Sequence, residues 1–358
     1  MSVTGREEER ILGIIETARA KRGKFRDERV NMAHGAGGKA TQSMIEGLFE
    51  PAFGAQVTED AASLEIAGAT LAFTTDSFVV KPLRFPGGSI GELAVNGTVN
   101  DLAVSGARPV ALVTTLVLEA GLPTETLVAE LHAMRRAARA AGVAIVGGDT
   151  KVVEHGKVDR LYIGTTGIGH PLPGVALSAR SVRPGDRILL SGPIGDHGIT
   201  VLLARGELDL EADLESDTRS VFPLVEALAG AAGADLRWMR DPTRGGVATS
   251  LNELALDSGL GIHLAEEAIP VRDAVRGACE LLGLDPLHIA NEGQFLAVVG
   301  AGAAERALAA VRAVPGGDGA VLIGEVREEP RGAVLAGSRY GGTRIVDMLV
   351  GDPLPRIC

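Results

Sequence analysis

Residues 123–151 read PTETLVAELHAMRRAARAAGVAIVGGDTK, and this stretch decides the fold. Leu127, Leu131, Met134 and Ala138 recur at helical spacing between a start at Pro123-Thr124 and a stop at Gly142, which predicts a helix. The apolar run 143–146 then predicts a buried strand. A helix that runs directly into a strand is typical of α/β domains.

Carboxylates close two such predicted strands. Asp149 follows the run 143–146, and Asp76 ends the apolar run 71–76. Strand ends in α/β domains open into ligand crevices, so with Asp60 and Asp101 these side chains would be enough to hold Mg²⁺ on phosphates. The alternative for each residue is a turn or helix-capping aspartate.

Two glycine-rich stretches point to an anion. The loop His34–Lys39 precedes a predicted helix over 40–49, where backbone amides at Gly37 and Gly38 and the charge of Lys39 suit a phosphate. Arg244, followed by two glycines at another helix start, can contact phosphate with its guanidinium. The first loop matches neither the Walker pattern nor a dinucleotide fingerprint, and an ordinary loop remains the alternative.

The segment 87–103 predicts a helix with an unusual polar face. Val95, Val99 and Leu102 form an apolar stripe, whereas Asn96 and Asn100 recur on another face. Because Asn costs helix stability relative to Ala, these residues need another reason. Polar packing at a dimer interface and a nucleotide pocket built on this helix both remain open.

Composition excludes several classes of protein. The 358 residues exceed the usual single core and indicate two domains. A net charge of -11 with only 3% aromatic residues argues against a nucleic-acid partner. Since the sequence has neither a signal-peptide core nor an apolar run of membrane-spanning length, we expect a soluble cytoplasmic protein. Its seven histidines occur singly, which makes zinc improbable.

Cysteine chemistry reduces to one candidate. Cys279 lies in a helical pattern and is expected to be buried and inert. Cys358 ends the sequence after two prolines, which predicts a mobile, extended tail without helix or sheet hydrogen bonds. A disordered end that happens to finish in cysteine is the alternative.

Composition shifts suggest the domain limits. A proline- and glycine-rich stretch over 170–186 marks a boundary, and charged residues around an apolar pattern at 11–15 suggest an amphipathic extension. We expect an N-terminal extension over 1–28, an ATP-binding and dimerisation domain over 29–170, a C-terminal α/β domain over 171–338 and a mobile tail over 339–358.

Several motifs together carry a family resemblance. They are Phe85–Gly91, Gly97–Asp101, Gly148–Val153, Asp241–Gly246, Ala290–Gly293 and Pro355–Cys358. In these residues the chain resembles the HypE family of hydrogenase maturation carbamoyl dehydratases, within the superfamily of aminoimidazole ribonucleotide synthetase, selenide water dikinase and thiamine monophosphate kinase. The resemblance implies a two-domain α/β fold of the aminoimidazole ribonucleotide synthetase type, with mixed sheets and helices, dimerising through first-domain strands.

The resemblance also implies an activity. Such an enzyme uses ATP and Mg²⁺ to dehydrate a carboxamide carried as a thiocarbamate on Cys358 to a thiocyanate. The carbamoyltransferase HypF would load the thiol, and the cyano group would pass to iron on a HypC–HypD scaffold as a ligand of [NiFe] hydrogenase. The implied partners are therefore HypF, HypC–HypD and a second copy of the chain, with no nucleic acid or membrane.

The resemblance assigns residues to roles. It implies that Cys358 carries the substrate, that Glu292 is the candidate base and that Lys151 polarises the carboxamide or relays protons, with His197 a weaker candidate base. A salt bridge for Lys151 and a turn carboxylate for Glu292 are the alternatives. The implied ATP ligands are Gly37, Gly38, Lys39, Asn100, Thr150, His197 and Arg244, and the implied metal ligands are Asp60, Asp76, Asp101 and Asp149.

The sequence differs from the family pattern at two places, and two alternative functions remain. Residues 1–28 precede the usual family start and have no assigned role, and Glu59-Asp60 stands where relatives often carry two aspartates, which leaves a second metal ligand there open. One rival is a small-molecule kinase of the same superfamily, such as selenide water dikinase, whose reactive residue lies near the glycine loop. The other is a nucleotide-binding scaffold that uses its tail only for docking.

Overall fold

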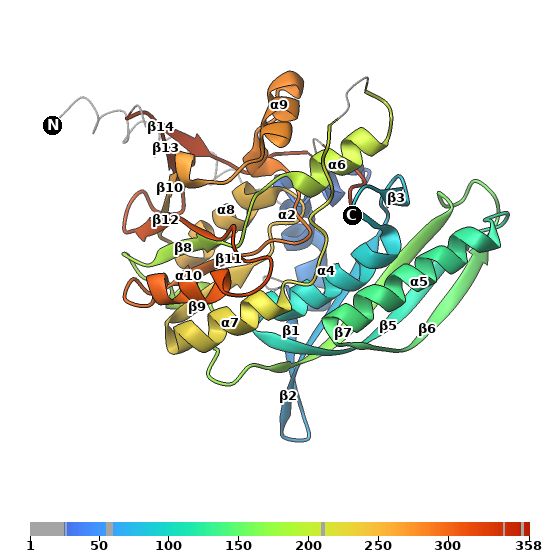
Figure 1. Cartoon of the computed structure of the whole chain (residues 1–358), viewed down its shortest axis with the longest axis horizontal. Coiled ribbons are helices and arrows are strands. Elements are labelled where there is room, and N and C mark those ends of the chain that lie inside the picture. The colour runs from blue at the N-terminus through green and yellow to red at the C-terminus, as the bar shows by residue number, and fades with distance from the viewer. Residues whose placement is uncertain (1–24, 26, 55–59, 209–211, 339–340, 352–353) are drawn as a thin grey trace.

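The structure, a computed structural model, describes residues 25, 27–54, 60–208, 212–338, 341–351 and 354–358. Two sheets, each covered by helices, lie next to each other (Figure 1). This arrangement confirms the predicted mixed α/β fold. The N-terminal extension predicted over 1–28 lies almost wholly outside the described residues.

The first sheet has five strands in the order β1-β2-β7-β5-β6. Only β5 and β6 pair in parallel, and the other neighbours are antiparallel. The strands are β1 (Ala62–Ile66), β2 (Ala69–Phe78), β5 (Ala107–Glu119), β6 (Ala144–Val153) and β7 (Leu161–Pro171), and β3 (Arg84–Phe85) pairs with β4 (Gly88–Ser89) in a separate hairpin.

Two helices, α4 (Ile90–Val104) and α5 (Thr124–Ala141), cover one face of this sheet (Figure 1). The predicted stripe Val95, Val99 and Leu102 is fully buried, and each such aliphatic side chain contributes about 2 kcal/mol by leaving water. Asn96 and Asn100 are buried as well, because α4 lies between the first sheet and the second domain. The helix is therefore covered on all sides, and this explains its low amphipathicity.

The second sheet has seven strands in the order β14-β13-β10-β12-β8-β11-β9. Only β10 and β13 pair in parallel. The strands are β8 (Arg187–Leu190), β9 (Leu236–Arg240), β10 (Gly261–Ala265), β11 (Leu296–Val299), β12 (Val321–Arg327), β13 (Val334–Gly337) and β14 (Thr343–Val346).

Side-chain alternation in these strands builds two apolar layers. Leu189 and Val299 pack with α7 (Phe222–Ala232) and α10 (Ala304–Arg312), whereas Ile188 and Val298 pack with α8 (Gly246–Ser258) on the opposite face. A strand with both faces apolar must be covered on both sides, as β8 and β11 are here.

The remaining elements lie around the contact between the two sheets. α6 (Asp196–Ala204) and α9 (Asp273–Leu282) extend the apolar core of the first domain, and this core includes the buried Cys279, as predicted. The other helical segments are η1 (Met32–Gly35), α2 (Lys39–Met44), the π-helical η2 (Ile45–Phe49), α3 (Glu50–Phe53), η3 (Ala179–Ser181), η4 (Gly233–Asp235), η5 (Glu266–Ala268) and η6 (Pro286–His288).

The structure corrects three local predictions. Asp76 and Asp149 lie inside β2 and β6 rather than at strand ends. The prediction of a buried strand after Gly142 is wrong, because β6 is a sheet edge whose Ile145 and Val146 are 38% and 66% exposed. The strand β14 falls within the segment predicted as a tail, so the second sheet continues to Val346.

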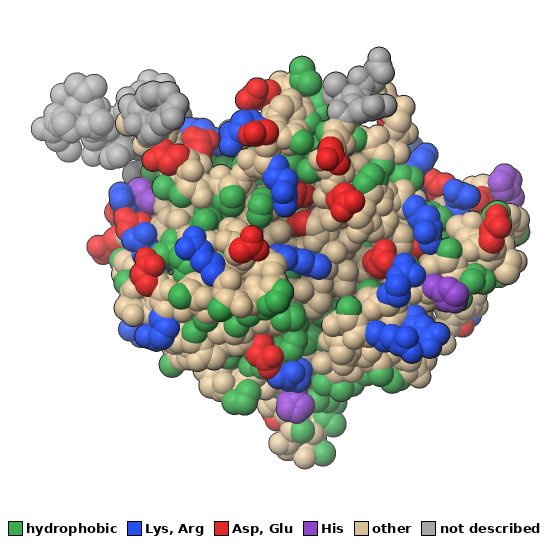
Figure 2. Space-filling model, viewed as in Figure 1, with side chains coloured by type: hydrophobic (Ala, Val, Ile, Leu, Met, Phe, Trp, Pro, Cys, Tyr) green, Lys and Arg blue, Asp and Glu red, His purple; other side chains and the backbone are tan. Residues whose placement is uncertain are grey.

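The surface carries charge of both signs. Basic and acidic side chains are interspersed over the face shown in Figure 2. In the described part of the chain no helix combines the length and the apolar character that crossing a membrane requires.

Candidate functional site

Four aspartates from both domains meet at the domain contact. Asp60 precedes β1, Asp76 lies on β2, Asp101 lies on α4, and Asp241 directly follows β9. Burial raises the pKa of Asp101 well above its ordinary value, and the charges of Asp241, Asp60 and Asp76 raise it further. Burial likewise raises the pKa of Asp241, and Asp60 adds to this. Mutual repulsion of this kind means that the cluster favours an added positive charge.

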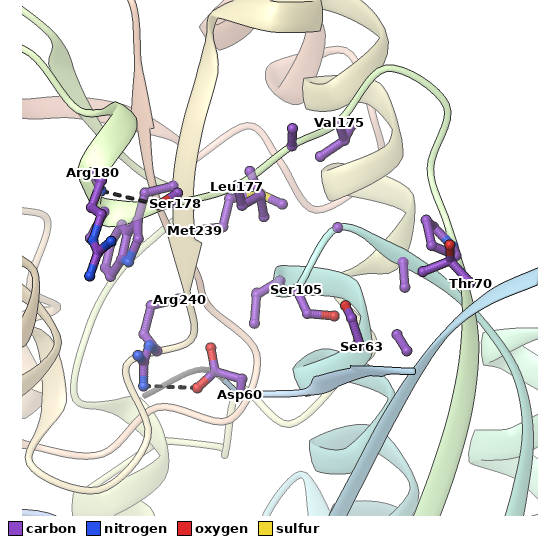
Figure 3. Close-up of a pocket in the computed structure, with 18 of the residues that line it drawn as sticks. Asp60, Ser63, Thr70, Ser105, Val175, Leu177, Ser178, Arg180, Met239 and Arg240 are labelled. Carbon is purple, nitrogen blue, oxygen red and sulfur yellow. Dashed lines mark hydrogen bonds and ion pairs between the residues drawn. The ribbon is translucent and has the colours of Figure 1, made fainter. Parts of the chain in front are cut away.

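Arginines partly balance these charges. Arg240 forms an ion pair with Asp60 at 2.9 Å and with Glu253 at 3.4 Å. Burial alone would lower the pKa of Arg240, but the carboxylates of Asp60 and Glu253 hold it above its ordinary value. The Asp60–Arg240 pair fixes one edge of the cluster across the two domains, as Figure 3 shows.

The glycine loop packs beside this cluster. Gly37 has a φ of +73°, and a Cβ there would lie 2.8 Å from the carbonyl oxygen of Arg244. Arg244 in turn donates to the carbonyl oxygen of Gly35 at 2.8 Å. Burial raises the pKa of both Asp76 and Glu292, and the charge of Arg244 opposes this rise. Lys39 is half exposed and forms an ion pair with Asp347. The loop, Arg244 and the acids thus occupy one region.

Glu292 is a buried carboxyl group in the same region. Its side chain is 3% exposed, and its Oε1 has no hydrogen-bond partner among the described residues. Burial raises the pKa of Glu292 well above its ordinary value, with Asp241 and Asp76 as further causes. A buried carboxyl group with a raised pKa and an open oxygen is a candidate for proton transfer.

The residues before Cys358 dock on the first domain. The amide of Val79 donates to the carbonyl oxygen of Cys358 at 3.1 Å, and the amide of Lys81 donates to that of Arg356 at 3.2 Å. Arg205 donates to the carbonyl oxygens of Pro355 and Arg356. The prediction of a tail without such hydrogen bonds is therefore wrong here, because prolines lose only donors and the carbonyl oxygens still accept.

Side chains anchor the tail as well. Leu354 and Ile357 are each 3% exposed and belong to the core of the first domain. Arg356 forms an ion pair with Asp159 at 2.9 Å, although its φ of 58° lies in the left-handed region. This conformation costs a non-glycine residue roughly 1–2 kcal/mol, so the docked tail retains some strain.

The docked cysteine lies near the acids. Val79, its backbone partner, is three residues from Asp76, and three extended residues span about 10 Å. Because paired backbones lie about 5 Å apart, the backbone of Cys358 is within roughly 15 Å of Asp76. A short movement of the tail can therefore bring the thiol to the cluster.

Three predicted site residues lie elsewhere in the chain. Asp149, Thr150 and Lys151 are exposed on β6, which β7 and β5 separate from β2. Asp149 forms an ion pair with Lys151 at 2.6 Å, and this hydrogen bond is the main reason that the pKa of Asp149 is lowered. Within one chain these residues do not join Asp76, Asp101 and Glu292.

Two other predicted ATP ligands have their side chains engaged by protein. The carboxamide of Asn100 donates to the carbonyl oxygens of Arg219 and Glu292 and accepts from the amide of Val221. His197 is fully buried and contacts Ile357 and Ser216 through its two ring nitrogens. Asn100 thus joins the two domains, and His197 contacts the tail.

The cluster fits Mg²⁺ through its oxygen donors. In the described ranges no three His, Cys, Asp or Glu side chains form a preassembled metal cage. Mg²⁺ does not need one, because it commonly binds one or two carboxylates together with water and substrate phosphates. The repulsion that raises the pKa values of Asp101 and Asp241 is what such a cation would relieve.

A cavity of about 660 Å³ lies between the domains, and both residues of the Asp60–Arg240 pair line it (Figure 3). Its lining combines Ser63 and Thr70 from the first sheet with Trp238 and Met239 from β9. Of the predicted site residues, Asp60 alone is among those that line it.

Comparisons with known proteins identify the family. The family model of the AIR synthase related protein N-terminal domain matches residues 58–170, and the model of the C-terminal domain matches residues 183–337. The carbamoyl dehydratase HypE of Azotobacter vinelandii is 50% identical over 337 residues, which cover 93% of this chain and 98% of the relative. The chain belongs to the HypE family of carbamoyl dehydratases.

Solved structures agree with this assignment. A HypE–HypF complex matches with a TM-score of 0.81 and 45% identity, covering 86% of this chain and 100% of that chain. A HypE structure in complex with ATP matches with a TM-score of 0.78 and 45% identity, covering 92% of this chain and 100% of that chain. The family and the fold predicted from the motifs of the sequence are thus confirmed.

Asp241 was not among the predicted site residues, although it lies among the clustered aspartates at the domain contact. The signal was present, because Asp241 opens the motif Asp241–Gly246 and directly follows the strand β9. Asp217, whose contacts with Glu292 are described below, had no such signal, since it ends a charged loop that resembles a solvated surface turn.

Proposed function

We propose that this chain carries out the ATP-dependent dehydration of a carboxamide on Cys358, which supplies cyanide ligands for the iron of [NiFe] hydrogenase. The carboxamide oxygen attacks the γ-phosphorus of ATP and releases ADP, and the amide nitrogen loses one proton. The O-phosphoryl intermediate then loses phosphate and the second nitrogen proton. The product is a thiocyanate, and the oxygen lost by the substrate leaves in the phosphate.

The docked position of Cys358 carries this proposal. The final residue is hydrogen-bonded to Val79, which follows β2 directly after the segment that bears Asp76. A small-molecule kinase has no need to hold its last cysteine near its acids. A docking scaffold has no need for a buried carboxyl group such as Glu292 beside the same acids.

Phosphate binding has clear candidates. Arg244 and the amide of Gly38 offer donors for the triphosphate, whereas the amide of Gly37 donates to the hydroxyl of Thr41 and that of Lys39 to the carbonyl oxygen of Leu349. Asp76, Asp101, Asp241 and Asp60 would hold Mg²⁺, which neutralises phosphate charge and favours phosphoryl transfer. ATP binding by a solved HypE structure, at 45% identity, supports the assignment of ATP to this chain.

Proton removal is assigned to Glu292. A carboxylate is a stronger base when its pKa is raised, and burial raises the pKa of Glu292. Its unpaired Oε1 is available to take a proton from the amide nitrogen. The dry surroundings also keep water from the intermediate.

Partners follow from the chemistry of loading and transfer. A carbamoyltransferase of the HypF kind must reach the thiol, and a HypC–HypD scaffold must receive the cyano group, so the tail must undock for both. The strained φ of Arg356 lowers the cost of undocking. A solved HypE–HypF complex supports HypF as the loading partner.

A second copy of the chain is the proposed cover of the first sheet. The face opposite α4 and α5 exposes Val110, Val113, Val146 and Ile168 by 37% to 66%. An apolar face of this extent marks a protein contact. In such a homodimer Asp149, Thr150 and Lys151 become interface residues, and they can act there on the partner subunit's nucleotide.

Replacing Val146 with Glu should dissociate this homodimer. A charge buried without a partner in an interface costs several kcal/mol, so we expect the dimer dissociation constant to rise at least about 100-fold. Sedimentation velocity over a concentration series measures the effect. Val128→Glu, on α5 at the opposite face of the same domain, is the control and should leave the dimer intact. A Val146→Glu protein that stays dimeric at low concentration would refute this interface.

Replacing Gly38 with Ala should weaken ATP binding. A Cβ at Gly38 would lie 2.2 Å from the carbonyl oxygen of Leu349, so the glycine loop must shift away from Arg244. We expect the dissociation constant of ATP to rise at least about 10-fold, measured by titration calorimetry with Mg²⁺. Gly35→Ala is the matched control, because a Cβ there has nothing within 4 Å. Equal affinity in both variants would remove the loop from the nucleotide site.

The proposed function is tested by stoichiometry. Protein carbamoylated on Cys358 should hydrolyse one ATP for each thiocyanate formed, and uncarbamoylated protein should hydrolyse ATP far more slowly. A kinase acting on a free small molecule would instead turn over many ATP molecules without change at Cys358.

A further inference from the structure

The loop Ser216–Arg219 reaches three parts of the site at once. It contacts His197, the turn at Glu292 and helix α4, which lie far apart in the sequence. It is also held to the first domain, because the amide of Ser216 donates to the carbonyl oxygen of Pro86 at 2.9 Å. Each contact can be assigned a direction from the hydrogen-bond chemistry of its partners.

On the tail side the contact passes through His197. The carbonyl oxygen of Ile357 can only accept, so His197 must donate to it from Nε2, at 2.7 Å. The neutral ring then has a lone pair on Nδ1, which accepts from the hydroxyl of Ser216 at 2.7 Å. Burial lowers the pKa of His197 to about 4, which keeps the ring neutral near pH 7. Ser216 therefore selects the tautomer that can hold the tail.

The imidazole has little freedom to move. His197 is fully buried and packs edge-to-face on Phe85, with ring centroids 5.5 Å apart. The hydroxyl of Ser216 also accepts from the amide of Thr218 at 3.2 Å, which orients its proton toward the ring. An unbroken chain of hydrogen bonds therefore runs from the amide of Thr218 through Ser216 and His197 to the carbonyl oxygen of Ile357.

On the other side the loop holds Glu292. The carboxylate of Asp217 accepts from the amide of Glu292 at 3.0 Å and also from that of Gly293. Arg219 donates from Nε to the carbonyl oxygen of Gly293 at 3.0 Å. A Cβ at Gly293 would lie only 1.7 Å from the carbonyl oxygen of Asp217, so the turn and the loop are in close contact. Glu292 cannot shift far unless Asp217 shifts too.

Helix α4 closes the arrangement. Asn100 donates to the carbonyl oxygens of Arg219 and Glu292, at 2.9 and 3.0 Å. The same carboxamide accepts from the amide of Val221 at 2.8 Å. Both the loop and the turn are therefore fixed to one buried side chain of the first domain.

We propose that Ser216 and Asp217 are positioning residues for the dehydration, which couple docking of the tail at Ile357 to the placement of Glu292. The inference rests on the proposed function for its chemical consequence, but the coupling itself is a property of the fold. When Ile357 leaves His197, the loop loses one of its fixed points and Glu292 loses part of its support. Glu292 is then held most firmly while the loaded cysteine is docked, and this limits futile ATP hydrolysis.

The test measures docking and chemistry separately. Docking is read from the rate at which iodoacetamide alkylates Cys358, resolved by peptide mass spectrometry, because an undocked thiol reacts faster and the rate follows the open population. Buried Cys279, with a pKa raised by burial to about 11, is the internal control for unfolding. Chemistry is read from thiocyanate formation on carbamoylated protein.

Ser216→Ala should accelerate alkylation of Cys358, although Ser216 does not touch the tail. Without its hydroxyl, His197 can place its proton on Nδ1 and turn a lone pair toward Ile357. Loss of one buried hydrogen bond predicts an increase of about 5- to 10-fold, with a similar fall in thiocyanate formation. Ser216→Thr, which keeps the hydroxyl, should restore both rates.

A double-mutant cycle tests whether Ser216 acts on Ile357 through His197 or whether its replacement only loosens the packing. His197→Gln keeps a side-chain N–H that can donate to Ile357 without help from Ser216. In that background Ser216→Ala should produce no further acceleration, and this comparison also serves if Ser216→Ala alone proves unstable. If the two changes had additive effects on the alkylation rate of Cys358, Ser216 would not act through His197 and the proposal would be wrong.

Asp217→Ala tests the second half of the coupling. Thiocyanate formation should fall by about 100-fold, and alkylation of Cys358 should also accelerate, although Asp217 touches neither His197 nor the tail. Alkylation at the wild-type rate in both Ser216→Ala and Asp217→Ala would overturn the proposal. Absence of thiocyanate from the wild-type protein would instead refute the proposed function, while the alkylation rates would still decide the coupling.

Discussion

Replacing Cys358 with Ser should abolish thiocyanate formation while ATP still binds within about twofold of its wild-type affinity. The hydroxyl of serine is a far weaker nucleophile than a thiolate, so the residue should not accept the carbamoyl group. The proposed nucleotide site consists of Asp76, Arg244 and the glycine loop and does not include this side chain. Intact mass measures loading, and calorimetry measures ATP binding.

Cys279→Ser is the matched control for this change. Cys279 is 1% exposed, and burial raises its pKa to about 11, so its thiol is a poor nucleophile. This variant should load and dehydrate at nearly the wild-type rate, with only a small loss of stability. If Cys279→Ser lost the product and Cys358→Ser kept it, the substrate would be carried on the other cysteine.

Asp241→Asn should lower thiocyanate formation by about 100- to 1,000-fold and at the same time stabilise the protein. The charge of Asp241 raises the pKa values of Asp101 and Glu292. Asp241 therefore lies close both to the proposed metal ligands and to the proposed base. Burial and the neighbouring carboxylate of Asp60 destabilise the charge of Asp241 in the folded state. A neutral side chain should therefore raise the free energy of unfolding by about 1 kcal/mol.

The two measurements of this variant are turnover and thermal unfolding in the absence of Mg²⁺. Asp235→Asn is the control, since Asp235 is half exposed and paired with Arg237 away from the cluster. A variant that lost activity through misfolding would be less stable than the wild type, whereas ours should be more stable. Normal turnover in Asp241→Asn would remove this residue from the site.

Local patterns in the sequence predicted the elements well. The helix that ends at Gly142 is α5, with Gly142 at a φ of +69°, and the helix predicted over 87–103 is α4. Turn and cap residues act through neighbours in the chain, so periodicity and glycine positions suffice for them. The family motifs then supplied the architecture.

Contacts between distant segments could not be predicted in this way. The tail docks because Val79, Lys81, His197 and Arg205 present donors, and none of them is near the tail in the sequence. The carboxamide of Asn100 joins the two domains for the same kind of reason. Exposure of β6 also depends on what covers the sheet, which the apolar run at 143–146 does not reveal.

The predicted metal and nucleotide ligands fall into two groups, those that lie close together in one chain and those that do not. The charges of Asp60 and Asp76 reach Asp101, because β2 and the helix α4 that covers it lie side by side, and their role as metal ligands stays a prediction. Asp149 and Lys151, which the resemblance placed in the same site, lie at a sheet edge within a single chain. Their assigned roles stay predictions that depend on the homodimer.

The central claim is that a cysteine-bound carboxamide loses water at the expense of ATP, and intact mass spectrometry of carbamoylated protein tests it most directly. With ATP and Mg²⁺, the peptide that ends in Cys358 should lose the mass of one water while one ADP appears for each molecule, and without ATP its mass should not change. Hydrolysis of ATP by the carbamoylated protein with no change in the mass of that peptide would contradict the account.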